Sequence, residues 1–372
     1  LDFNEAELVG FSISYMDNHG FYCPLGHNSD ADKNLPFDKA IKMLKELFEH
    51  KELTVVGQNF KYDMNVVKKY SINFKTSIED TMLMSYVLNS GGKHDLGTLA
   101  SNFLDHEAIS YEDVVGKGKD QITFADVDMQ KAVTYACEDS DLTLLLYGKL
   151  KSKLLKDKRL YDVYRSIEIK LMLIIAEMEY LGVSIDNKEL DKQSNDLKKR
   201  IDKIENQIYS ISGREFNISS PKQIQEIFYD ELKLPVLKKT PKGQPSTNED
   251  VMTQLAENHE LPSLILSFRN LLKLKNTYTD KLGVQVSSVS KRLHTSYNQT
   301  ITITGRLSSS SPNLQNIPIR TTDGKKIRSA FIPRQGFKLF SADYSQIELR
   351  IMAHLSDDSE MIKSFVDGED IH

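Results

Sequence analysis

Residues 340–356 read FSADYSQIELRIMAHLS, and the hydrophobic period changes within this stretch. Over residues 337–343 the side chains divide into two alternating faces, which predicts a strand that ends at Asp343. From Ile347 onward the apolar residues recur with a helical period. The pattern therefore predicts a strand that delivers the Asp343 carboxylate to its end, followed by a helix with Glu348 in its first turn.

A carboxylate at the end of a strand is a rigid place to hold Mg²⁺, which prefers oxygen ligands. In phosphoryl transfer, two such ions activate the attacking oxygen and stabilise the leaving one. Because one aspartate cannot hold two ions, a partner acid would have to come from elsewhere in the fold. Aspartate is also a favoured helix N-cap, and spacing alone favours capping by Asp343 over metal binding.

A chain of 372 residues predicts two or three domains, and its 40% hydrophobic and 27% charged content is typical of a globular protein. No apolar run approaches the ~20 residues of a membrane span, and the sequence from Leu1 lacks the order of a signal peptide. Cys23 and Cys137 form neither a disulfide framework nor a zinc spacing, which suits a reducing cytosol.

Charge is distributed unevenly along the chain. Residues 1–150 hold 24 acidic and 14 basic side chains, whereas residues 151–372 hold 29 acidic and 34 basic ones. We therefore expect a polyanion to bind mostly to the second part. Solvated surfaces with uneven charge explain the composition equally well.

The first part alternates short β-like runs with amphipathic helices, which predicts a mixed α/β domain. Strands are expected at residues 7–15, 20–26 and 53–59. Helices are expected at residues 37–50, 61–70, 80–90, 94–104 and 129–150. A basic stretch at residues 149–159 marks a domain boundary.

The second part carries a helical stripe of five apolar residues, Leu197, Ile201, Ile204, Ile208 and Ile211. Their spacing of four, three, four and three predicts one apolar face that needs a helical partner. Residues 261–282 supply a partner within the chain, so we favour an intramolecular hairpin over a homodimeric coiled coil. Between the two, Ser220 is expected to cap a short helix that has Pro221 at its first position.

Two motifs, TGRLSSSSPNLQNIPIR at residues 304–320 and SADYSQIELRIMAHLS at residues 341–356, resemble those of bacterial family A DNA polymerases. Other stretches resemble the same family in colinear order: VGQNFKYD, DTMLMSYVLNS, GKGKDQITF, YACEDSDLT, FNISSPKQI, LKKTPKGQPST and KLKNTYTDKL. One such motif could arise by chance, but this ordered series identifies the chain as a member of the family.

The resemblance implies a multidomain architecture of the α/β and α+β classes. A ribonuclease H-like 3′–5′ exonuclease domain would occupy residues 1–155, without its N-terminal strand. A partial polymerase domain would follow at residues 156–372, with a helical thumb at about 187–285 and the palm at about 156–186 and 286–372.

In the implied polymerase site, Asp343 resembles the first of two palm aspartates that bind Mg²⁺. Glu348 resembles the acid beneath the sugar of the incoming nucleotide, where a carboxylate leaves no room for a 2′-hydroxyl. Arg320 and His372 match positions near the triphosphate, whose charge suits cationic or hydrogen-bonding groups. The floor of the same site would be lined by Tyr344, Ser345, Gln346 and Ile347.

The residues implied to face the primer–template are Thr302, Arg306, Asn313, Gln315, Asn316, Arg269 and Lys273. Long polar side chains can donate to the minor-groove acceptors that every correct base pair presents similarly. Arg269 and Lys273 lie four residues apart on one helix face, which suits contact with successive phosphates. Ordinary surface hydration is the alternative for each, and without the resemblance it is preferred for all but Arg306.

Asp63, Tyr135 and Asp139 match three positions of the exonuclease site, and Asn59 and Tyr62 would shape its pocket. Such a site needs several carboxylates for two metal ions, and a tyrosine that orients the attacking water. A core tyrosine and a solvated acid are the alternatives for Tyr135 and Asp139.

The resemblance further implies Mg²⁺ at two-metal sites, with Mn²⁺ as an alternative. It implies primer–template DNA and deoxynucleoside triphosphates as partners, no membrane partner, and a monomer of the bacterial cytoplasm that acts at the nucleoid in replication and repair. An Asp-x-Glu pair would precede Leu1, and the fingers helix and second palm aspartate would follow His372, so we expect both sites to be incomplete in this chain. A ribonuclease D-like exonuclease would leave residues 304–320 unexplained, and a non-catalytic DNA-binding module predicts the loss of acids that are present.

Overall fold

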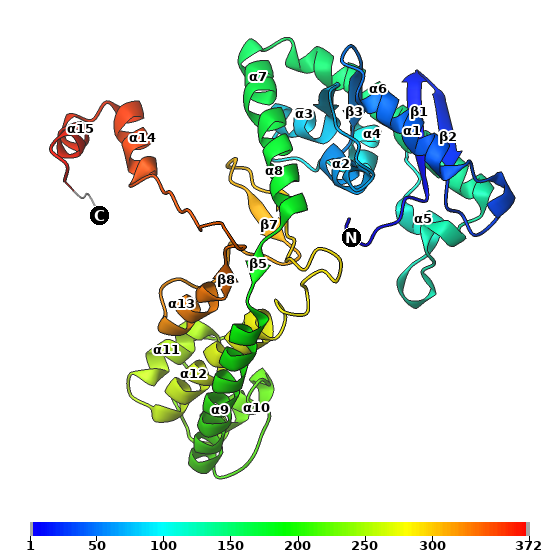
Figure 1. Cartoon of the computed structure of the whole chain (residues 1–372). Helices are drawn as coiled ribbons and strands as arrows, with labels where there is room; N and C mark the ends of the chain where they lie inside the picture. Colours follow the sequence, from blue (N-terminus) through cyan, green and yellow to red (C-terminus); the bar gives the residue numbers. More distant parts are fainter. Residues whose placement is uncertain (1–2, 370–372) are drawn as a thin grey trace. The chain divides into compact units, whose positions relative to one another are not determined.

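A computed structural model describes residues 3–369 of the chain, and Figure 1 shows its course. The chain divides into two units, Leu1–Phe331 and Ile332–His372, which are described one at a time. Among residues 3–369, every helix is too short or too polar to span a bilayer.

The mixed α/β character predicted for the first part is confirmed, with element ends shifted by a few residues. Strands β1 and β2 form an antiparallel hairpin in which Ile13 faces Phe21, and β3 and β4 form a parallel pair in which Thr54 faces Ser77. The strands are β1 (Gly10–Met16), β2 (His19–Pro24), β3 (Thr54–Gly57) and β4 (Ser77–Asp80). The helices are α1 (Phe37–Phe48), α2 (Phe60–Lys68), α3 (Thr81–Leu88), α4 (Leu96–Leu104), α5 (Tyr111–Val115) and α6 (Met129–Leu154).

Helix α6 organises this part of the chain because it packs against the β1–β2 hairpin and also against α3 and α4. Its residues Leu146, Leu150 and Leu154 are fully buried. On the hairpin side, Gly20 approaches α6 so closely that a Cβ atom there would lie 2.5 Å from the carbonyl oxygen of Cys137. Only glycine fits this position without displacing backbone.

The elements after α6 pack on the same core. Tyr164, in a π-helical turn at Tyr164–Glu168, is fully buried, and Ile169 and Met172 of α8 (Ile169–Leu181) join the same hydrophobic cluster. Helix α7 (Lys158–Val163) precedes this turn, and α8 ends at Leu181, with Gly182 as its C-cap residue. The domain boundary near residue 155 stays a prediction.

The predicted helical hairpin is confirmed. Helix α9 (Asn187–Ser212) packs along α12 (Glu260–Leu274), and Figure 1 shows the two side by side. Of the predicted stripe, Leu197, Ile201 and Ile208 are buried in one cluster with residues of α12. Ile211 at the end of the helix is 38% exposed.

Shorter elements complete the first unit. Ser220 caps α10 and Pro221 occupies its first turn, as predicted. Its remaining elements are β5 (Ser184–Ile185), α10 (Pro221–Gln225), α11 (Glu249–Ala256), β6 (Ser296–Asn298), β7 (Ser308–Ser310) and α13 (Thr322–Ser329), and β8 (Phe331–Ile332) spans the division between the two units. Strands β6 and β7 pair in antiparallel fashion, with Tyr297 opposite Ser309.

The second unit contains α14 (Ile347–Ser356) and α15 (Ser359–Val366), which pack on each other. The helix predicted from Ile347 is confirmed. The strand predicted at residues 337–343 is wrong, because this segment forms no ladder with any other segment of residues 3–369. Alternating side chains favour an extended backbone, but a strand also needs a neighbour for its N–H and C=O groups. Phe340 is accordingly 90% exposed.

Candidate functional site

Asp63 lies one turn into α2, directly after β3. The chain turns from strand to helix at Asn59, whose left-handed φ of 57° is one that asparagine tolerates better than most residues. Asp63 retains solvent exposure, yet the density of protein around its carboxyl group raises its pKa to about 7. The nearby charge of Asp80 raises the pKa further.

Asp80 ties the starts of two helices together, a role that the sequence analysis missed. Its Oδ2 accepts from the Phe60 N–H of α2 at 2.8 Å, and its Oδ1 accepts from the Leu83 N–H of α3 at 3.0 Å. The residue is 1% exposed. Burial raises its pKa, whereas these hydrogen bonds lower it. An Asp-Thr pair before an apolar helical run is an N-cap signal, and it could have revealed the cap though not the link to α2.

A second missed residue, Lys61, connects α2 to α8 and β6. Its Nζ donates to Glu179 Oε1 at 2.6 Å and to the carbonyl oxygen of Tyr297. The Tyr297 N–H donates to the same Glu179 oxygen at 2.5 Å. The three groups thus form a buried cluster whose lysine lies two residues before Asp63.

Tyr135 and Asp139 meet on α6, one helical turn apart. Burial raises the pKa of Asp139 to about 6, a hydrogen bond from the Tyr135 hydroxyl opposes this rise, and the charge of Glu138 adds to it. Burial also raises the pKa of Tyr135, with the Asp139 charge as the next cause, so the phenol stays protonated and donates. The rings of Tyr111 and Phe124 pack against Tyr135 at centroid distances of 6.2 and 6.0 Å.

These acids do not form one cluster in the structure. Within residues 3–369, no group of three His, Cys, Asp or Glu side chains lies close enough to hold a metal ion. The Asp63 carboxyl has Asp80 as its electrostatic neighbour, whereas Asp139 has Tyr135 and Glu138. Asp63 and Asp139 are nonetheless oxygen donors with raised pKa values, and a divalent cation would stabilise the ionised form of each.

Hydrogen bonds order the loop that contains most of the residues implied to face DNA. Ser309 Oγ donates to Asn313 Oδ1 at 3.1 Å, and Gln315 Nε2 donates to the Leu307 carbonyl oxygen at 3.0 Å. Thr302 Oγ1 donates to the carbonyl oxygen of Arg306 at 2.6 Å.

Other residues of this set either contact the α9–α12 hairpin or are exposed to solvent. The Asn316 carbonyl oxygen accepts from the hydroxyl of Tyr278, which joins the loop to the α9–α12 hairpin. The side chains of Arg306 and Arg320 are exposed. The DNA contacts of the whole set stay a prediction.

Arg269 and Lys273 lie on α12, as predicted, but in different environments. Arg269 is half-buried and its Nη1 donates to the Thr247 carbonyl oxygen at 2.9 Å, while burial lowers its guanidinium pKa. Lys273 is exposed. The lysine is therefore the more accessible cation on this helix face.

The acids at residues 343–348 lie in the second unit. Asp343 is exposed in a segment that belongs to no helix or strand, and Gln346, with φ 52°, is the N-cap residue of α14. The alternative in which Asp343 caps the helix is therefore wrong. Glu348 lies in the first turn of α14, as predicted, whereas His372 lies outside the described residues.

The other residues of the implied floor surround this N-terminus. Tyr344 is 81% exposed and Ile347 42% exposed. The Ser345 carbonyl oxygen accepts from Arg350 Nε at 3.1 Å, which holds the segment against the first turns of α14.

The sequence matches two protein families. Residues 1–155 match the family described as 3′-5′ exonuclease, and residues 187–372 match DNA polymerase family A. Among curated relatives, DNA polymerase I of Pseudomonas aeruginosa is 45% identical over all of this chain and 41% of its own length. DNA polymerase I of Rhizobium leguminosarum is 44% identical over all of this chain and 38% of its own length.

A solved structure matches as well. It is the POL domain of Pol1 from M. smegmatis in complex with DNA primer-template and dNTP, which is 32% identical. The match has a TM-score of 0.78 and covers 95% of this chain and 57% of that one. The chain thus spans about two fifths of the length of these curated relatives. We conclude that it belongs to DNA polymerase family A and spans a 3′–5′ exonuclease domain and part of the polymerase domain.

Proposed function

We propose that this chain forms the proofreading part and the first polymerase part of an enzyme for template-directed DNA synthesis. In this reaction the 3′-hydroxyl of a primer attacks the α-phosphate of a deoxynucleoside triphosphate and releases pyrophosphate. The proposal rests above all on the match to both families in the order exonuclease then polymerase. The solved relative that holds primer-template and dNTP supports the same partners for this chain.

The finer architecture is part of the proposal. Residues 1–155 would form a ribonuclease H-like domain in which α2 and α6 position the acids. Residues 187–285 would form the thumb, built on the α9–α12 hairpin, and residues 156–186 and 286–372 would belong to the palm. A monomer in the bacterial cytoplasm, acting at the nucleoid in replication and repair, fits this assignment.

For proofreading, Asp63 and Asp139 would hold Mg²⁺ or Mn²⁺. Bound divalent ions supply a nucleophilic oxygen near neutral pH and neutralise charge on the phosphate. Tyr135 would hold the Asp139 carboxylate in place through its hydroxyl and then orient the attacking water. Asn59 and Tyr62, on either side of the start of α2, would shape the pocket for the primer end.

For synthesis, Asp343 would hold Mg²⁺ together with a second acid. Glu348 would pack beneath the sugar and exclude a 2′-hydroxyl, while Tyr344, Ser345, Gln346 and Ile347 would complete the floor. Arg320 and His372 would bind the triphosphate. The primer–template would lie against Arg306, Thr302, Asn313, Gln315, Asn316, Arg269 and Lys273.

Two single substitutions test the proposal, each made in a protein of the same length as its relatives. Asp343→Asn should abolish primer extension and leave primer–template binding within about tenfold, because it removes charge that stabilises the transition state rather than backbone contacts. Asp139→Asn should abolish removal of a mispaired primer end and leave extension intact. Extension by Asp343→Asn near the wild-type rate, or mismatch removal by Asp139→Asn, would refute the assignment.

A further inference from the structure

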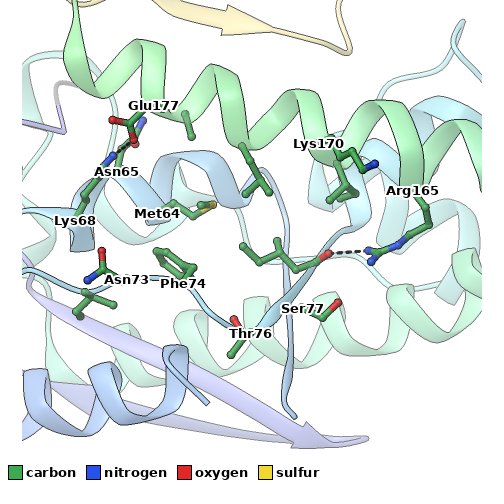
Figure 2. Close-up of a pocket in the computed structure, with 15 residues that line it drawn as sticks. Met64, Asn65, Lys68, Asn73, Phe74, Thr76, Ser77, Arg165, Lys170 and Glu177 are labelled. Atoms are coloured by element: carbon green, nitrogen blue, oxygen red, sulfur yellow. Dashed lines mark hydrogen bonds and ion pairs between the residues drawn. The ribbon is translucent and has the colours of Figure 1, made fainter. Parts of the chain in front are cut away.

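A cavity of about 430 Å³ lies between α2, the segment of residues 72–78 and α8. Figure 2 shows α8 along one side of this space and the segment with Thr76 and Ser77 along the other. Its volume lies in the range of small-molecule sites, which is roughly 300–1,000 Å³. None of the acids of either proposed active site lines it.

Two buried polar groups in the wall of this cavity have no hydrogen-bond partner within residues 3–369. They are Nδ2 of Asn65 and Oγ1 of Thr76, in residues that are 2% and 8% exposed. They come from different elements, and Figure 2 shows the Thr76 hydroxyl facing α8 across the space. A buried polar group without a partner destabilises the fold, so a molecule that hydrogen-bonds both groups would recover free energy.

The charged side chains that line the cavity favour one sign of charge on the ligand. Lys68 is paired with Glu177, and Arg165 donates to the Ile78 carbonyl oxygen at 3.1 Å and lies 3.5 Å from Glu79. Lys170 is exposed at the rim and has no ion-pair partner in residues 3–369. Lys68 and Arg165 are thus each matched by a carboxylate, and the remaining charge of Lys170 favours an anion.

The remaining wall is apolar. It is formed by Met64, Ile72, Phe74, Ile78, Ile169 and Leu173. An inorganic ion would leave this surface uncovered, whereas a flat organic group would cover it and lie near Phe74. The wall therefore favours a ligand with an apolar body over a simple anion.

We propose that this cavity binds a small organic anion with a flat apolar body, of the size of a nucleoside monophosphate. The anionic group lies at Lys170, the flat body lies on the apolar wall, and Asn65 and Thr76 hydrogen-bond its polar edge. None of the residues that line the cavity belongs to either proposed active site, and its occupancy does not depend on the function proposed for them.

Binding is measured on the whole chain in EDTA, by NMR of isoleucine δ1-methyl groups. Ile72 and Ile169 report on the cavity, and Ile208 in the α9 core is the internal control. The probes are dAMP, deoxyadenosine, inorganic phosphate and 4-hydroxybenzoate. We expect saturable shifts of the two cavity methyl groups with dAMP or 4-hydroxybenzoate, much weaker shifts with deoxyadenosine, and none with phosphate alone.

The choice between the two organic anions identifies the source of the ligand. Preference for dAMP indicates a nucleotide, and preference for 4-hydroxybenzoate indicates another planar acid. Because dAMP could also bind at the proposed exonuclease site, the titration is repeated with Asp139→Asn, in which the cavity shifts should persist. The proposal would be overturned if neither dAMP nor 4-hydroxybenzoate gave a saturable shift, or if the shifts were lost in Asp139→Asn.

Two variants test the assigned contacts. Lys170→Ala should weaken binding about tenfold, as expected for loss of one charge-assisted hydrogen bond, whereas Lys149→Ala, which changes an exposed lysine of α6, should have no effect. Thr76→Val keeps the shape and removes the hydroxyl, so it should weaken binding and raise the melting temperature of the ligand-free chain. A lower melting temperature would show that the hydroxyl already has a partner, such as a bound water, and would contradict the argument.

Discussion

Lys61 Nζ lies 2.6 Å from Glu179 Oε1, and the two side chains are only 11% and 5% exposed. The pair joins α2, which carries Asp63, to α8, which lies 118 residues further along the chain. Burial raises the pKa of Glu179, and the Lys61 charge opposes that rise. The position of Asp63 therefore depends on an ion pair that lies outside the proposed exonuclease site.

Replacement of Lys61 by Met should lower the free energy of unfolding by about 3–5 kcal/mol, because it leaves the Glu179 carboxylate buried without its cation. The double variant Lys61→Met with Glu179→Leu should recover part of this loss. Urea denaturation of the three proteins measures the effect. A single variant as stable as the wild type would show that the pair contributes nothing.

Tyr135→Phe should reduce mismatch removal by about tenfold to a hundredfold, the usual effect of losing a group that orients a metal ligand. The hydroxyl lowers the pKa of Asp139, so its loss should also move the pH profile of the exonuclease upward. Tyr111→Phe, which keeps the ring beside Tyr135, is the matched control. A reduced rate with an unchanged pH profile would argue against the hydrogen bond as the cause.

Divalent-metal binding should strengthen as the pH rises from about 5 to 8. Asp139, with a pKa of about 6, and Asp63, with a pKa of about 7, must lose their protons before they can hold a cation. Calorimetric titration with Mn²⁺ at several pH values measures this dependence. Affinity that stays constant over this range would exclude both carboxylates as ligands.

The same two groups predict how stability depends on pH without metal. Their folded pKa values lie above the usual value of 3.8, so the folded chain binds more protons than the unfolded chain between about pH 4 and 7. Stability should therefore fall as the pH rises through this window. Asp63→Asn should flatten the curve in thermal denaturation, and an unchanged slope would show that Asp63 does not titrate there.

Glu348→Ala should admit ribonucleotides during primer extension, because the smaller side chain leaves room for a 2′-hydroxyl. Incorporation of ribonucleoside triphosphates is compared with incorporation of deoxyribonucleoside triphosphates in a protein of the same length as its relatives. Glu360→Ala, which changes an acid in the first turn of α15, is the control. Unchanged sugar selection in Glu348→Ala would remove this residue from the proposed steric role.

Local sequence signals predicted the helices well. The stripe from Leu197 to Ile208 specifies one face of α9, and the Ser220–Pro221 pair specifies the start of α10, because helices are stabilised by neighbours three or four residues away. The strand at residues 337–343 failed for the opposite reason. Alternation defines the faces of a strand, but its ladder partners are remote in sequence.

The candidate site was predictable to a similar extent. Tyr135 and Asp139 lie four residues apart on one helix, a spacing that places side chains on the same face. Asp80 and Lys61 were missed because each acts on a distant element, and a single sequence carries no sign of such pairing. The placement of Asp63 relative to Asp139 likewise depends on how α2 and α6 pack, which no local pattern specifies.

The contact between Gly20 and Cys137 has a consequence for the proposed proofreading function. The hairpin backbone lies against the turn of α6 that holds Tyr135 and Asp139, with no space for even a methyl group. Any side chain added at this glycine must displace that turn, although it touches neither acid. In the proposed enzyme, a substitution at Gly20 of β2 would therefore impair proofreading without altering either acid.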